Sequence, residues 1–123
     1  MNVDGIKNAD ALTEIYGQWP AFHDAEVLRF TLERSRQFQD EPTFLELVVA
    51  DRGGELDAPH VVTLRFTGVR DLKLDGFDDQ NVLFEIEMTH VAEGEWKTVC
   101  LGSTDFAGEW TSKSVEVVAV RPL

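Results

Sequence analysis

The chain has 123 residues, of which 43% are hydrophobic and 28% are charged, a composition typical of one globular domain over residues 1–123. Its single cysteine, Cys100, excludes an internal disulfide and a zinc site built of thiolates. The net charge of −12, from 23 acidic and 11 basic residues spread along the chain, disfavours nucleic acid and anionic membranes as partners and favours basic ones.

A short helix is predicted over residues 8–16. Asn8 can cap its first turn, and Gly17 is typical of a helix end. The apolar residues of this segment share one helical face: Leu12, Ile15 and Tyr16. The helix cannot continue through Trp19, because Pro20 crowds the residue before it.

After the helix, the hydrophobic pattern has a period of two, which indicates β-strands with one inward and one outward face. The predicted strands cover residues 26–33, 44–50, 61–67, 69–74, 82–89, 95–101 and 114–120. No helical pattern separates the later strands, so we expect antiparallel neighbours. The predicted fold class is therefore α+β and mostly β. One short N-terminal helix lies on a largely antiparallel sheet of about seven or eight strands, arranged as a sandwich or a partly open barrel.

The same alternation predicts which side chains form the core. We expect these residues to point inward: Leu28, Phe30, Leu32, Leu47, Val62, Leu64, Phe66, Phe84, Ile86, Trp110 and Val117. Glu85 and Glu87 alternate with the inward residues of their strand and are expected to face solvent. Replacing Phe30 or Phe84 by alanine is accordingly expected to cost about 3–5 kcal/mol.

The densest group of aromatic and ionisable side chains comprises Trp19, Pro20, Phe22, His23, Asp24 and Glu26. A metal site would need a bend, because in an extended segment Asp24 and Glu26 share one face and His23 points to the other. Pairing His23 with a carboxylate could support acid–base catalysis, but no nucleophile motif or glycine-rich phosphate loop accompanies it. We favour a structural role, in which the two aromatic rings close one end of the core and His23 and Asp24 bind the backbone.

A loop rich in aspartate is the second candidate site. With the outward face of the strand that follows, it supplies six candidates for binding a protein partner: Asp75, Phe77, Asp78, Asp79, Glu85 and Glu87. A calcium site is disfavoured because the loop lacks the distal bidentate glutamate of an EF-hand. Phe77 can be the apolar anchor of one negative surface. The alternative is that the loop is only a turn, Phe77 folds into the core and the acids are merely solvated.

Residues 15–27, with the sequence IYGQWPAFHDAEV, resemble the start of the immunity protein 50 family of bacterial polymorphic-toxin systems. In that family a similar W-P-x-F-H-D-A-E stretch leads into the first strand. The run over residues 69–82 and the closing valine-rich strand are also similar, so the resemblance covers nearly the whole chain. It implies a mostly β protein that protects its producer by binding a cognate toxin, and it carries no established catalytic residues.

We therefore predict a cytoplasmic immunity protein that neutralises its toxin by occlusion, with no catalytic, cofactor-binding or metal-binding residues. The residues 1–10 are polar and acidic, unlike a secretory signal. A basic nuclease is one candidate toxin, because an acidic blocker competes with nucleic acid. The alternative function is a small β-domain with a ligand-binding or enzymatic pocket centred on His23. Occlusion of a toxin needs a broad surface of roughly 800 Å² per partner. A ligand-binding or enzymatic site needs a concave pocket.

Overall fold

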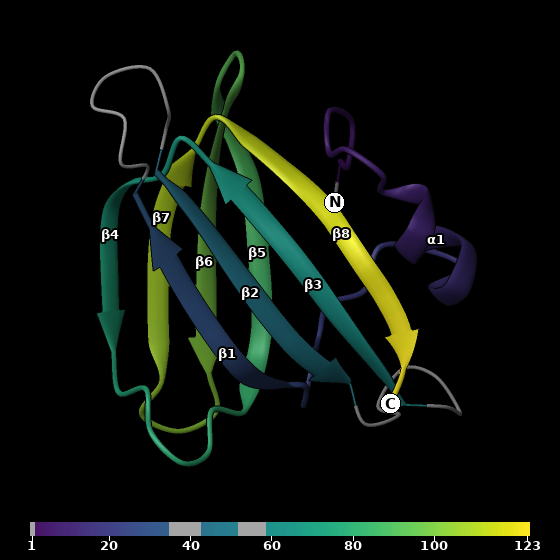
Figure 1. Cartoon of the computed structure of the whole chain (residues 1–123), viewed down its shortest axis with the longest axis vertical. Helices are drawn as coiled ribbons and strands as arrows, with labels where there is room; N and C mark the ends of the chain where they lie inside the picture. The colour runs from purple at the N-terminus through teal and green to yellow at the C-terminus, as the bar shows by residue number, and fades with distance from the viewer. Residues whose placement is uncertain (1, 35–42, 52–58) are drawn as a thin grey trace.

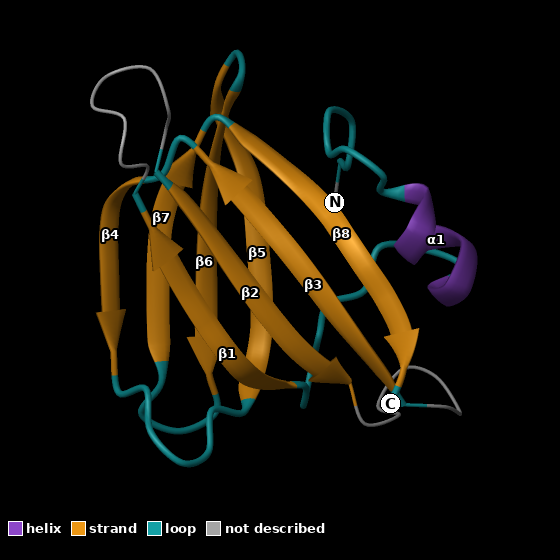
Figure 2. Ribbon diagram, in the orientation of Figure 1, coloured by secondary structure: helices purple, strands orange, loops and turns teal. Residues whose placement is uncertain are grey.

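Two stacked sheets enclose the core in the computed structural model, which describes residues 2–34, 43–51 and 59–123. The described elements are α1 (Asp10–Tyr16), β1 (Glu26–Glu33), β2 (Phe44–Asp51), β3 (His60–Thr67), β4 (Arg70–Asp75), β5 (Leu83–Ala92), β6 (Glu95–Gly102), β7 (Ala107–Ser112) and β8 (Ser114–Pro122). Sheet A has the strand order β1-β2-β3-β8, and sheet B has the order β4-β7-β6-β5. Sheet A lies in front of sheet B in the view of Figure 1, and Figure 2 shows how little helix accompanies the strands.

All neighbouring strands of both sheets pair antiparallel, which confirms the predicted fold class. The inner faces of the two sheets meet around Trp110, whose ring contacts Phe66 and Phe30 edge-on at centroid distances of 5.0 and 5.8 Å. Such tilted aromatic pairs add to the stabilisation that burial provides. The predicted inward positions that are fully buried are Leu47, Val62, Leu64, Phe66, Ile86, Trp110 and Val117.

Three residues expected in the core are exposed: Leu28 by 47%, Leu32 by 49% and Phe84 by 51%. Leu28 and Phe84 each sit where the pairing register shifts by one residue, in β1 and β5 respectively. Such a bulge reverses the alternation, so buried Val27 and Leu83 take the inward places instead. Leu32 does pair with buried Leu45, but it lies near the end of an edge strand and stays half exposed.

The helix α1 is shorter than predicted and begins differently. It starts at Asp10, and Asn8 does not cap it; the side-chain amide of Asn8 donates instead to the carbonyl of Val117 in β8, at 3.0 Å. Gly17 ends the helix in the left-handed conformation, as expected. The helix lies beside β8 in Figure 1 and inserts Leu12, which is fully buried, into the core. No helix in the described part of the chain is long and apolar enough to cross a membrane.

Strand β7 is the element that the hydrophobic pattern does not predict. Residues 102–108 contain two glycines and look like a turn, yet β7 already begins at Ala107. It forms the centre of sheet B together with β6. On the inner face of β6, the thiol of Cys100 is fully buried, and this burial raises its pKa to about 12. Cys100 is therefore a core residue, protonated at neutral pH.

Candidate functional site

Residues 19–25, which we name the strap, connect the helix to sheet A by running along the outer edge of β5 in sheet B. Three main-chain hydrogen bonds fix this path. The N–H of Ile86 donates to Ala21, the N–H of Asp24 donates to Leu83, and the N–H of Leu83 donates to Ala25, at 3.2, 2.9 and 2.7 Å. The W-P-x-F-H-D segment therefore joins the two sheets before the chain enters β1.

The strap alternates between buried and exposed side chains through unusual backbone geometry. Phe22 and Asp24 both have positive φ, of 61° and 64°, although neither is glycine. This left-handed conformation costs free energy for such residues and persists only where packing enforces it. Here Phe22 is buried in the core between the sheets, while the side chains of His23 and Asp24 point to solvent. Trp19 is only partly buried against the same core.

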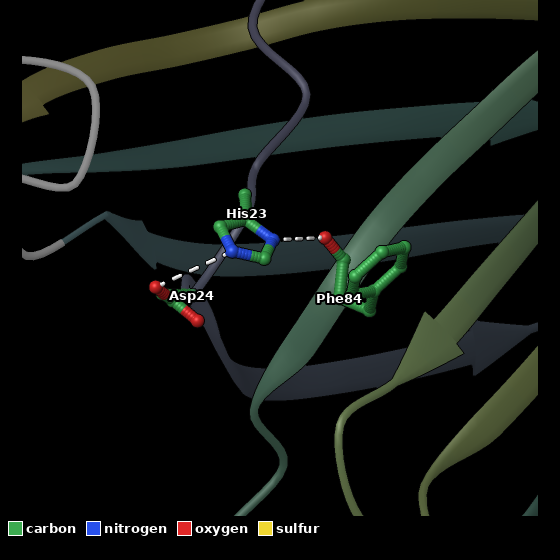
Figure 3. Close-up of polar contacts among 3 residues, drawn as sticks. All are labelled: His23, Asp24 and Phe84. Atoms are coloured by element: carbon green, nitrogen blue, oxygen red, sulfur yellow. Dashed lines mark hydrogen bonds and ion pairs between the residues drawn. The ribbon is translucent and has the colours of Figure 1, made fainter.

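His23 is held on the surface by one hydrogen bond to the main chain (Figure 3). Its Nδ1–H donates to the carbonyl oxygen of Phe84 at 2.9 Å, since a carbonyl can only accept. Its ring also meets the exposed Phe84 ring edge-on, with centroids 5.3 Å apart. Asp24 Oδ2 lies 3.6 Å from His23 Nε2, and both side chains are more than half exposed. His23 thus ties the strap to β5.

This geometry offers little for metal binding or catalysis. In the described residues, no three His, Cys, Asp or Glu side chains are grouped closely enough to hold a metal ion. Neither of the two surface grooves of sheet B, described below, is lined by His23. His60 lies near Tyr16, and His90 stacks on Trp96, so these two histidines belong to other surroundings.

The aspartate-rich loop between β4 and β5 is ordered by Asn81, which is buried. The side chain of Asn81 accepts a hydrogen bond from the N–H of Asp78 and donates one to the carbonyl of the same residue, both at 2.9 Å. The carboxylate of Asp78 accepts from the N–H of Gln80 at 3.0 Å. Phe77 remains 43% exposed while its ring rests edge-on against buried Phe106. Phe77 is therefore partly anchored in the fold and partly available to a partner.

This loop packs against the loop between β6 and β7, below sheet B in Figure 1. Gly76 has a φ of +68°, and any side chain there would overlap the carbonyl of Asp105. Asp105, which sequence reasoning missed, thereby joins the acidic residues of the first loop. Residues 75–83 and 101–107 contain no lysine, arginine or histidine. We name this region the acidic end, and it comprises Asp75, Phe77, Asp78, Asp79 and Asp105.

Glu85 and Glu87 lie apart from the loop, on the outer face of edge strand β5. Through the strand pairs, Glu85 shares one row of that face with Leu101, Ala107 and Asp75. Three strand spacings place Asp75 and Glu85 roughly 14 Å apart. The pKa of Glu85 is raised, chiefly because its carboxyl hydrogen-bonds with Glu87, and also because of desolvation and the charge of Glu87. These two carboxyls are thus close neighbours on an exposed edge.

Between these two acidic regions the outer face of sheet B is hollowed and mainly apolar. A groove of about 620 Å³ is lined by residues of β4, β6 and β7, and its outward apolar side chains are Val99, Leu101 and Ala107. The carboxylate of Glu109 in the same groove has a lowered pKa, first because Lys97 donates a hydrogen bond to it at 3.0 Å and then through the charges of Lys97 and Lys73. The groove therefore lies between the acidic end and the pair of Glu85 and Glu87, and its carboxylate Glu109 is paired with two lysines.

The family model of immunity protein 50 matches residues 8–123 of the chain. The chain belongs to the immunity protein 50 family. The match includes the strap and the acidic end, so both are features of an immunity protein whose partner is a cognate toxin and whose role is to neutralise it. Immunity proteins of this kind are typically not enzymes. Neither the search of curated proteins nor the search of solved structures gives a significant match.

Proposed function

We propose that this immunity protein neutralises its toxin by occlusion in the cytoplasm, with the acidic end and the outer face of sheet B covering a basic active site. The observation that carries the proposal is the acidic end itself. Two loops from different parts of the chain meet there and contribute four carboxylates and no basic side chain. A surface of one sign attracts a complementary partner and accelerates its approach.

The neighbouring apolar groups make this surface suited to a stable complex. Phe77 and Leu101 are each about 40% exposed beside the carboxylates. In protein interfaces, aromatic and apolar anchors supply much of the affinity, while the charges around them set the approach and the orientation. A toxin that acts on nucleic acid carries a basic groove for the phosphates. Carboxylates placed over such a groove would exclude its substrate.

Occlusion predicts competitive inhibition of the toxin domain encoded beside the immunity protein. The inhibitor concentration that halves toxin activity should rise linearly with substrate concentration, because substrate and immunity protein need the same groove. The measurement is a steady-state assay of the toxin domain at several concentrations of substrate and of immunity protein. Inhibition that is independent of substrate concentration would contradict occlusion and indicate an effect at a distance.

A matched pair of variants tests which surface is used. Asp79→Lys with Asp105→Lys changes the acidic end, and Glu14→Lys with Glu33→Lys makes the same change of charge at exposed positions of α1 and β1. The first pair should weaken inhibition strongly, and the second should leave it nearly unchanged. Equal effects of the two pairs would remove the acidic end from the interface.

A further inference from the structure

Strand β5 leaves part of its outer edge open. It is the longest of the described strands and forms one edge of sheet B. The strap covers this edge only as far as the hydrogen bond from Ile86 to Ala21, and in the described residues no main-chain hydrogen bond joins Met88 to the strap. Since alternate residues of a strand point their N–H groups to the same side, those of Met88 and His90 face the same edge as that of Ile86. No strand in the described part of the chain pairs with them there.

Two of the other three described edge strands, β8 and β4, are protected in ways that β5 is not. Lys7 pairs with the outer edge of β8 through hydrogen bonds to Val115 and Val117. Strand β4 is short, has an irregular register between Arg70 and Lys73, and carries these basic residues. Short length, bulges and lysine are the usual means by which proteins prevent a further strand from adding to an edge. Between residues 86 and 90, β5 keeps a regular register and contains no lysine or proline.

A groove of about 480 Å³ lies along this open edge. It is lined by Trp19, Pro20 and Ala21 of the strap and by residues 85–89 of β5. Its ionisable lining residues are Glu85 and Glu87, so the groove has negative charge and no basic side chain in its lining. Its opposite wall is the partly buried ring of Trp19. The groove therefore combines unpaired main chain, two carboxyls and an aromatic surface.

We infer that this groove is a docking site for an extended, basic segment of the toxin, which adds to sheet B as a further strand beside β5. The main chain of the segment hydrogen-bonds with Met88 and His90. Its alternate side chains face opposite sides: a lysine or arginine meets Glu85 and Glu87, and an apolar residue packs toward Trp19. The inference rests on the proposed function, because it takes the toxin as the partner, and it adds a second contact with a defined geometry.

Charge decides between this occupant and a second copy of the chain. Two copies joined edge to edge would bring two pairs of Glu85 and Glu87 together on molecules that each carry a net charge of −12. Like charges placed across neighbouring strands destabilise the pairing. A basic segment instead relieves the repulsion between the two glutamates. Charge complementarity therefore favours the toxin segment.

Hydrogen exchange measured on the full immunity protein, with and without the toxin domain encoded beside it, tests the inference. Within residues 87–91, the amides of Met88 and His90 should exchange at least about tenfold more slowly in the complex, because their new main-chain hydrogen bonds must open first. Residues 29–33 of β1, an edge strand of sheet A outside the proposed interface, provide the internal control. Sedimentation of the free protein determines whether a second copy occupies the edge.

A pair of variants at His90 isolates the main-chain contact. His90→Ala and His90→Pro both lose the ring that stacks on Trp96 and contacts the carbonyl of Asp4 at 3.2 Å, but only His90→Pro also loses the outward N–H. His90→Pro should bind the toxin about three- to tenfold more weakly than His90→Ala, the effect of one hydrogen bond. Glu87→Lys should weaken binding more than Glu33→Lys, which changes the net charge equally.

The outcomes separate the inference from the proposed function. Protection of residues 87–91 together with the specific loss in His90→Pro supports strand addition. Toxin binding that leaves exchange at 87–91 unchanged, with equal affinity for the two His90 variants, overturns strand addition and leaves occlusion by the acidic end standing. A free protein that is already dimeric and protected at 87–91 overturns the inference in favour of a second copy. If the toxin domain does not bind at all, both the inference and the proposed function fail.

Discussion

Leu83 and Phe84 are neighbours in β5, yet Leu83 is fully buried and Phe84 is half exposed. Strict alternation from Ile86 and Met88 places Phe84 inside, and the sequence contains no sign that contradicts it. The bulge is possible because both residues are apolar, so either can occupy the core. The exposed Phe84 then helps to fix the strap, because its carbonyl accepts a hydrogen bond from His23. A bulge between two apolar residues cannot be predicted from hydrophobic patterning alone.

Truncating these two residues should therefore have unequal effects on stability. Leu83→Ala should lower the free energy of unfolding by about 2–5 kcal/mol, because it leaves a cavity in the core. Phe84→Ala should cost only about 1 kcal/mol, the order of its edge-on contact with His23. This replaces the larger cost expected from sequence alone. Urea denaturation of both variants measures the difference, and equal losses would contradict the bulge.

The raised pKa of Glu85 gives a second prediction at single residues. Because its main cause is the hydrogen bond with Glu87, Glu87→Gln should lower the pKa of Glu85 toward its ordinary value. A carboxyl whose pKa is raised by folding favours the folded state at low pH, and this contribution is lost as pH rises through the folded-state pKa. Carbon-detected NMR titration of the glutamate carboxyls measures the change. An unaltered Glu85 pKa in Glu87→Gln, as in the control Glu33→Gln, would contradict this pairing.

At the scale of elements, α1 depends on tertiary contacts for its existence. A helix of seven residues is far too short to be stable by itself in water. Leu12 inserts into the core, and the hydroxyl of Tyr16 donates to the carboxylate of Asp51 in β2 at 2.7 Å. The helical spacing of these residues predicted the element correctly. Its place beside β8 could not be predicted, because the Asn8 amide reaches a strand more than a hundred residues away.

Two apolar residues of α1 should respond differently to truncation. Leu12→Ala should cost about 2–5 kcal/mol, since Leu12 is fully buried in the core between the sheets. Ile15→Ala should cost less than about 1 kcal/mol, because Ile15 is 40% exposed on the same helix. Chemical denaturation followed by tryptophan fluorescence measures both. Similar costs for the two variants would indicate that the helix is seated on a different face.

The positions of the strands in the sequence were easier to predict than which strands pair with one another. Alternation indicated most of them, but β7 was hidden by the glycines that precede Trp110. Sheet order depends on distant pairings, such as β3 with β8 and β4 with β7, and no local pattern encodes these. For the same reason the sequence indicated Asp75, Asp78 and Asp79 as one group and missed Asp105. Only the contact of Gly76 with the second loop brings Asp105 to them.

At the scale of the whole molecule, folding makes an even charge distribution uneven. The acidic residues are spread along the chain, yet the acidic end contains four of them and no basic residue. On the sheets some acids are neutralised, as in the pair of Arg65 with Glu46 at 2.7 Å on sheet A and the pairs that Glu109 makes on sheet B. Net charge alone leads us to expect a basic partner, whereas the location of the acidic end depends on the fold.

This local field predicts how fast the toxin binds and how salt changes that rate. If the acidic end steers a basic toxin, the association rate constant should fall steeply as added salt screens the field, whose range is about 8 Å at physiological ionic strength. The dissociation rate constant should change much less, because it depends on the contacts formed after docking.

Asp79→Lys with Asp105→Lys should slow association at low salt, whereas Glu14→Lys with Glu33→Lys, with the same net charge, should slow it little. Asp78 is left unchanged because its carboxylate accepts from Gln80 and orders the loop. Stopped-flow measurement across a salt series gives the association rate constants. A rate constant that changes neither with salt nor with Asp79→Lys and Asp105→Lys would rule out steering by the acidic end.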